Sequence, residues 1–156
     1  MRLHPGLLLL PALLMGCGED DEGGEEGGRP EVEYLMANPN SGMPFSDAVR
    51  IEDLLILSGQ VGTDSTGQLV SGGIAAETRQ TMENIKAVLE RNGASMDDII
   101  KCTAMLLDMA EWGAMNEVYR PYFTKHLPAR SALGASGLAL GARIELECWA
   151  VVPERD

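Results

Sequence analysis

An arginine and a glutamate near the end of the chain are the residues whose types and spacing best suit chemistry. Arg130 lies in the run Pro128–Ser131, and Glu145 lies fifteen residues later in the strand-like run Arg143–Glu147. A guanidinium group can clamp a carboxylate with two charge-assisted hydrogen bonds, and a glutamate that faces the same cavity can position a water molecule. The pair therefore predicts hydrolysis of a small molecule that bears a carboxylate.

Each of these residues also has a purely structural interpretation. Most arginines are solvated, so the alternative for Arg130 is a surface salt bridge at the start of a strand. Glu145 and Glu147 share one face of a strand, because side chains alternate between the two faces. At least one of the two carboxylates can therefore simply face solvent.

Apolar periodicity and turn signals predict the elements that position this pair. Asn92-Gly93 supplies a helix stop, Asp108 and Glu111 have capping-box spacing, and Pro121 is expected to kink or end a helix. The order is an α+β (split α/β) pattern with both helices on one face of a sheet. The predicted elements are two extended pieces within 48–58, a helix over 74–89, a strand over 99–107, a helix from 112 to 122, and strands over 129–133 and 144–152.

Several segments match the motifs of one family in order and spacing. They are Leu57–Gly62, Gln80–Leu89, Asp97–Thr103, Met115–Tyr119 with Tyr122 and Phe123, and the closing runs Pro128–Ser131 and Ile144–Glu147. Together they cover roughly residues 40–153, and on them the chain resembles the RidA (reactive intermediate deaminase) family, also called the YjgF family.

The resemblance implies an architecture and a set of site residues. The implied fold is chorismate-mutase-like, with a six-stranded mixed sheet, two helices on one face, and a homotrimer whose active sites lie between two subunits. It implies that Arg130 and Glu145 are the catalytic residues, with Glu145 rather than Glu147 orienting the water. The implied substrate-binding residues are Arg130, Ser58, Gly59, Asn116 and Phe45.

Structural alternatives exist for these positions as well. Ser58 and Gly59 would otherwise only terminate a strand, and Asn116 would otherwise be a solvated amide on a helix. Tyr119 is expected to be a core residue at helical spacing. Two departures from the family pattern concern the pocket: Phe45 stands where a tyrosine is common, and Ala132 stands where a cysteine often follows Pro-Ala-Arg-Ser.

The first thirty residues have a different composition from the rest. A basic residue, a short apolar stretch and Gly16-Cys17 predict a secretory signal peptide over 1–16, in which Cys17 resembles the lipidated cysteine of bacterial lipoproteins. Residues 17–30 are acidic and glycine-rich, which predicts an extended tether. The resemblance implies that residues 31–156 form a RidA-like domain. Because Gly18 follows the cysteine, we expect anchoring in the bacterial cell envelope, with the outer membrane favoured; the alternative is an ordinary cleaved signal peptide.

Charge and cysteine content exclude some functions. Without Arg2, Arg29 and the six acidic residues of the tether, the 12 basic and 24 acidic residues of the chain fall to 10 basic and 18 acidic residues. The body therefore stays acidic, and nucleic acid is an improbable partner.

The spacing of Cys102 and Cys148 fits no metal motif, so no metal is expected. We expect two free, buried thiols; a disulfide, favoured by an oxidising envelope, is the alternative.

The function that follows is hydrolytic deamination of enamine or imine carboxylic acids of the 2-aminoacrylate type to 2-keto acids and ammonia, without a cofactor. Arg130 would bind the substrate carboxylate and Glu145 would orient the attacking water. The alternative is a trimeric module, anchored in the envelope, that binds a small carboxylate or a protein without chemistry. Release of ammonia from imino acids discriminates the two.

Lipidation at Cys17 has a direct test. The wild-type protein is expected to fractionate with membranes and Cys17→Ser to remain soluble, because the acyl chains supply the only strong membrane affinity in the chain. Equal membrane retention of the two proteins, measured by fractionation and immunoblotting, would contradict the lipoprotein assignment.

Overall fold

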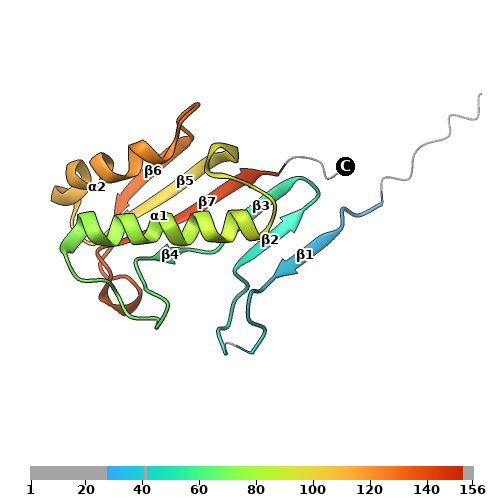
Figure 1. Ribbon diagram of the computed structural model, residues 1–156, viewed down its shortest axis with the longest axis horizontal. Coiled ribbons are helices and arrows are strands. Elements are labelled where there is room, and N and C mark those ends of the chain that lie inside the picture. Colours follow the sequence, from blue (N-terminus) through green and yellow to red (C-terminus); the bar gives the residue numbers. More distant parts are fainter. Residues whose placement is uncertain (1–27, 41, 153–156) are drawn as a thin grey trace, which may run out of the picture.

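A mixed sheet with two α-helices packed on one face makes up the described part of the chain, residues 28–40 and 42–152 of the computed structural model (Figure 1). The signal segment, Cys17 and the tether up to residue 27 lie outside the described residues. Among the helices of the described part, none is long and apolar enough to cross a membrane.

The predicted elements are present in the expected order, and β1 and β4 are two strands that the sequence analysis did not predict. The strands are β1 (Val32–Leu35), β2 (Ala48–Ile51), β3 (Leu54–Leu57), β4 (Gln60–Val61), β5 (Ile99–Leu106), β6 (Ala129–Gly134) and β7 (Ile144–Val151). The helices are α1 (Gly73–Arg91) and α2 (Trp112–Tyr119), with 3₁₀ turns η1 (Met96–Asp98), η2 (Met109–Glu111), η3 (Arg120–Tyr122) and η4 (Ala139–Gly141).

The sheet runs in the order β1-β2-β3-β7-β5-β6, and β4 pairs with β7 beyond the end of β3. The sheet is therefore six strands wide, as expected. The described residues form seven strands because β3 and β4 both pair with β7 and share one position in the sheet. Only β5 and β6 are parallel, so the sheet is mixed. β6 forms one edge, which leaves the outer side of the strand that carries Arg130 without a neighbour within the described chain.

Local signals explain where the elements begin and end. β2 and β3 form a hairpin that turns at Glu52, whose φ of 54° is left-handed. The backbone N–H of Asn92 bonds the last carbonyls of α1, and its side-chain amide donates to the carbonyl of Val88 at 2.8 Å. Pro121 ends the regular helix: α2 stops at Tyr119 and continues as η3.

The expected capping box between Asp108 and Glu111 is wrong. The Asp108 carboxylate accepts the N–H of Ala110 at 2.9 Å and does cap the turn. Glu111, however, forms an ion pair with Arg143 at 2.5 Å instead of reaching back to the cap. Arg143, directly before β7, binds this carboxylate in place of the cap. The spacing of Asp108 and Glu111 does not reveal this partner, because it is distant in sequence.

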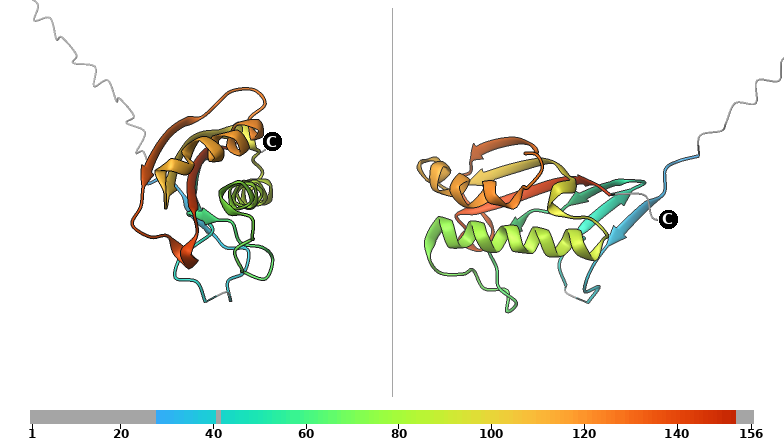
Figure 2. Two further views of the ribbon diagram at one scale, coloured as in Figure 1. Left: turned by 90° about the vertical axis from the view of Figure 1, so that its left-hand side faces the viewer. Right: turned by 45° about the horizontal axis from the view of Figure 1, so that its top comes forward.

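The two faces of the sheet differ in burial. Both helices cover the same face (Figure 2), and the core lies between them and the sheet. The strands β2, β3, β5 and β7 alternate buried and half-exposed positions, as expected for one covered face. The uncovered face carries half-buried or exposed apolar side chains, namely Val49, Ile51, Leu54, Ile56, Met105, Leu133, Trp149 and Val151.

The expectation of free cysteines is also wrong: Cys102 and Cys148 form a disulfide. They are direct cross-strand partners on β5 and β7, with Cα atoms 4.1 Å apart, and both side chains are fully buried under the helices. The prediction that each is a small buried residue in a strand is correct. Their pairing depends on the register of two strands 46 residues apart in sequence, which periodicity does not provide.

The disulfide is expected to stabilise the fold. In the chain-entropy model, closing a loop of this length contributes about 4 kcal/mol. Cys102→Ala combined with Cys148→Ala in a Cys17→Ser background should therefore lower the free energy of unfolding measured in urea by about 2–4 kcal/mol. Titration of the unreduced, denatured Cys17→Ser protein with a thiol reagent should find no free thiol; two free thiols would contradict the disulfide.

Candidate active site at Arg130 and its counterpart at Glu145

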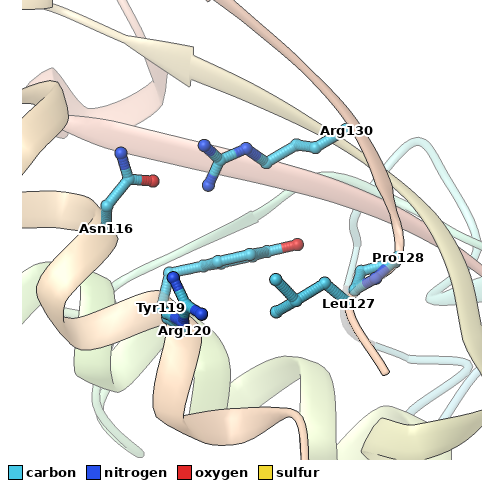
Figure 3. Close-up of a pocket in the computed structure, with 6 residues that line it drawn as sticks. All are labelled: Asn116, Tyr119, Arg120, Leu127, Pro128 and Arg130. Carbon is cyan, nitrogen blue, oxygen red and sulfur yellow. The ribbon is translucent and has the colours of Figure 1, made fainter.

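Arg130 lines a cavity of about 320 Å³ between α2 and the start of β6 (Figure 3). Its Cα is in register with Cys102 of β5, so its side chain leaves the sheet on the helix-covered face. The other residues that line the cavity are Asn116, Tyr119, Arg120, Leu127 and Pro128. The volume is at the lower end of the range for small-molecule pockets, which suits a compact ligand.

Three side chains of α2 hold the guanidinium group of Arg130. Its central carbon lies 4.8 Å from the centre of the Tyr119 ring and 5.8 Å from that of Trp112, and Nη1 lies 3.8 Å from the sulfur of Met115. These contacts are cation–π and thioether contacts. Within the described residues no carboxylate pairs with Arg130, so the donors that do not contact the Met115 sulfur stay available for an anionic ligand.

Trp112, Met115 and Tyr119 are therefore neighbours of Arg130, whereas the sequence predicted Tyr119 only as a core residue. Tyr119 is indeed buried, and its ring packs at 4.8 Å from that of Phe123. The signal that could have identified the group is the spacing of three, four and seven residues, which places all three side chains on one helix face. The sequence spacing does not reveal that this face packs against Arg130, because that contact depends on the tertiary structure.

Glu145 lies in a different environment, on the uncovered face of the sheet. It pairs with Met105 of β5 and Val61 of β4, and its side chain is half-buried. A Cβ atom built on Gly59 would collide with the Glu145 carboxylate, so this carboxylate packs directly against Gly59 and would have to move if a larger residue stood there. The structure therefore brings together two predicted site residues, Gly59 and Glu145.

Ser58 and Phe45 belong to this second group. The Ser58 hydroxyl donates to the carbonyl of Ser46 at 2.7 Å, and the Ser58 N–H donates to the carbonyl of Asp47 at 3.0 Å. These bonds hold the chain after β3 against the segment that follows Phe45, whose ring is 48 % exposed. The Ser58 oxygen keeps acceptor capacity for a ligand.

The predicted site residues thus form two groups rather than one. Arg130 and Asn116 lie at the helix-side cavity, and Phe45, Ser58, Gly59 and Glu145 lie around the junction of β3, β4 and β7. Within one chain the side chains of Arg130 and Glu145 leave opposite faces of the sheet, because Arg130 is in register with Cys102, and Glu145 with Met105. Glu147, also on the uncovered face, accepts a hydrogen bond from the Trp149 indole at 2.9 Å.

Burial raises the pKa of Tyr119 to about 12, although the nearby Arg130 charge acts in the opposite direction. The phenol therefore stays neutral at physiological pH and offers Arg130 an uncharged ring. Its hydroxyl has no hydrogen-bond partner among the described residues. Among all the residues that the structure describes, no group of three or more His, Cys, Asp or Glu side chains could hold a metal ion.

Comparison with known proteins identifies relatives over most of the chain. Residues 36–152 match the family model described as Endoribonuclease L-PSP. The mouse protein named 2-iminobutanoate/2-iminopropanoate deaminase is 41% identical over 109 residues, covering 69% of this chain and 81% of its own length. A RutC family protein of Pyrococcus horikoshii is 42% identical, covering 77% and 96%. A Rid family protein from Yersinia pestis has a solved structure with a TM-score of 0.73 at 33% identity, covering 78% and 100%.

The Tyr119 hydroxyl provides a test of this geometry. Tyr119→Phe keeps the ring and removes an unpaired buried hydroxyl, so the free energy of unfolding at pH 7 should fall by less than about 1 kcal/mol or rise slightly. A phenol with a pKa near 12 in the folded state and near 10 when unfolded contributes stability below pH 10 that is lost as the pH rises through 12. Urea unfolding at pH 7 and pH 11 should show a smaller alkaline loss in the variant. A larger loss at pH 7 would mean that the hydroxyl has a partner.

Proposed function

The chain belongs to the Endoribonuclease L-PSP family, also called the RidA or YjgF family, and from this membership we propose that it is an enamine/imine deaminase. It hydrolyses 2-imino acids, formed from enamines of the 2-aminoacrylate type, to 2-keto acids and ammonia. The observation that carries the proposal is the Arg130 guanidinium, which faces a cavity and has no carboxylate partner among the described residues. Relatives named as deaminases of 2-iminobutanoate and 2-iminopropanoate support the same chemistry.

Arg130 binds the substrate carboxylate through two parallel N–H···O contacts. Glu145 accepts a hydrogen bond from a water molecule and takes its proton as the oxygen attacks the imine carbon. The imine nitrogen gains protons, the carbon–nitrogen bond breaks and ammonia leaves, so one water is consumed for each 2-keto acid formed. General-base assistance of this type is worth about 10²–10⁴-fold; because imines also hydrolyse unaided, this modest acceleration is sufficient.

The site is shared between two copies of the chain in a homotrimer. In one chain Arg130 and Glu145 leave opposite faces of the sheet, so a site that contains both needs Arg130 from one copy and Glu145 from the next. Arg130 lies on an edge strand, where a second copy can approach it. The apolar residues of the uncovered face supply a surface that association would bury. Non-catalytic binding is the rival function, and the names of the relatives do not favour it.

The enzyme is exported and anchored through Cys17. The N-terminal sequence supports this proposal, and the pairing of Cys102 with Cys148 agrees with it, because disulfides persist in oxidising compartments. Its substrates would then be imines or enamines that arise in, or reach, the cell envelope.

Substitutions at Arg130 and Glu145 test the mechanism. Arg130→Lys should lose most of its affinity for substrate, because an ammonium group cannot reproduce the planar two-point contact. Glu145→Gln should bind a 2-keto acid nearly normally and lose turnover by about 10²-fold or more. The measurements are ammonia release from imino acids generated by an amino-acid oxidase, and product binding by calorimetry. Wild-type rates in both variants would refute the deaminase assignment, and Arg130-dependent binding without any wild-type turnover would support the binding module.

The trimer has its own test. Light scattering of the soluble Cys17→Ser protein at micromolar concentration should give three times the mass of one chain, because the uncovered apolar face is expected to drive association. A stable monomer that retains full turnover would contradict a site shared between chains.

A further inference from the structure

The segment that leads from α2 into β6 has an unusual charge for this protein. Residues 120–130 contain Arg120, Lys125, His126 and Arg130 but no aspartate or glutamate, in a chain with 24 acidic and 12 basic residues. This segment also supplies most of the lining of the Arg130 cavity. The cavity is thus a cationic region on an otherwise acidic molecule.

Arg120 is the second guanidinium group at this cavity. It follows Asn116 by one helical turn, so the two side chains lie on the same face of the helix, and both line the cavity with Arg130. Arg120 belongs to η3 and Arg130 to β6; in the view of Figure 3 Arg130 lies above the Tyr119 ring and Arg120 below the start of the Tyr119 side chain. Arg120 is exposed, and the described part of the chain offers it no ion pair.

The neighbouring cations are less available to a ligand in this cavity. Lys125 lines an adjacent cavity, and its backbone N–H donates to the Asp97 carboxylate at 3.2 Å, so an acidic group lies close to it. His126 lines the same adjacent cavity and is absent from the lining of the Arg130 cavity. Arg120 is therefore the cation best placed to act together with Arg130.

The rest of the lining fits a short apolar linker between two anionic groups. Tyr119, Leu127 and Pro128 supply ring and aliphatic surface, and the Asn116 amide supplies a polar contact. A monocarboxylic imino acid would use Arg130 and leave Arg120 without a partner. A dicarboxylic imino acid would occupy both guanidinium groups and place its methylene groups on the apolar surface.

We propose that the site selects dicarboxylic 2-imino acids, with Arg130 binding the carboxylate next to the imine carbon and Arg120 binding the terminal carboxylate. The inference rests on the proposed deaminase function and names its substrate class. The reaction is the same hydrolysis: water adds to the imine carbon, ammonia leaves, and the product is a 2-oxo dicarboxylate. Arg120 is a specificity-determining residue, because it contacts only the part of the substrate that does not react.

The test compares two ligands that differ only at the far end. 2-Oxoglutarate and 2-oxopentanoate have the same number of carbons, and the second has a methyl group in place of the terminal carboxylate. The wild-type protein should bind 2-oxoglutarate about tenfold more tightly by calorimetry, the lower end of the range for a charge-assisted hydrogen bond, because Arg120 is exposed. The preference should shrink as salt is raised.

Two variants assign that preference to a residue. Arg120→Gln should remove most of the difference between the two ligands, and Lys125→Gln, which deletes the same charge from the adjacent cavity, should leave the difference unchanged. The same pattern is expected in the ratio of kcat/KM for the imino acids formed by an oxidase from glutamate and from 2-aminopentanoate. Equal affinities in the wild-type protein, or a preference that survives in Arg120→Gln, would overturn the proposal.

The binding and turnover measurements separate this inference from the proposed function. A tenfold binding preference that requires Arg120, without turnover of either imino acid, would sustain the dicarboxylate site and refute the deaminase. Turnover of both imino acids at equal efficiency, with equal product affinities, would sustain the deaminase and refute the dicarboxylate site.

Discussion

The alternation of side chains across one sheet constrains the rest of this structure. Two helices cover one face, so every second residue of the central strands lies in the core and the residues between lie on the uncovered face. Arg130 is in register with the buried Cys102, and Glu145 with the half-exposed Met105. The two residues best suited to the chemistry are therefore assigned to opposite faces by the same pattern that builds the core. The proposed trimer, in which a second copy would meet the edge strand β6, would bring the two residues into one site.

The surroundings of Arg130 show how the fold keeps a cation ready for a ligand. A carboxylate beside Arg130 would neutralise its charge and occupy its donors. Two aromatic rings and a thioether hold the guanidinium group instead. The nearer ring is the phenol of Tyr119, which is neutral at pH 7 even with an ordinary pKa, and burial raises its pKa further to about 12. Two carboxylates on elements next to α2 have other partners: Glu111 of η2 pairs with Arg143, and Glu83 of α1 accepts a hydrogen bond from Tyr122.

Much of the fold follows from local sequence. The helix end at Asn92 and the interruption at Pro121 both lie where stop and breaker residues predict them. Long-range pairing does not follow from these signals. The bond between Cys102 and Cys148 and the ion pair between Glu111 and Arg143 depend on strand register and on a loop distant in sequence. Similarly, sequence motifs identified Arg130 and Glu145 as site residues. That their side chains lie on opposite faces of the sheet follows only from the strand register.

The central claim is that each active site takes Arg130 from one chain and Glu145 from the next, and a complementation experiment tests it most directly. Arg130→Ala and Glu145→Gln chains with different affinity tags are co-expressed, and trimers that contain both are purified through the two tags in succession. In a cyclic trimer every mixed assembly has one interface in three with both residues intact, so deaminase activity should return to about one third of the wild-type value. Trimers of two differently tagged Arg130→Ala chains serve as the inactive control. Mixed trimers as inactive as that control would contradict the shared site.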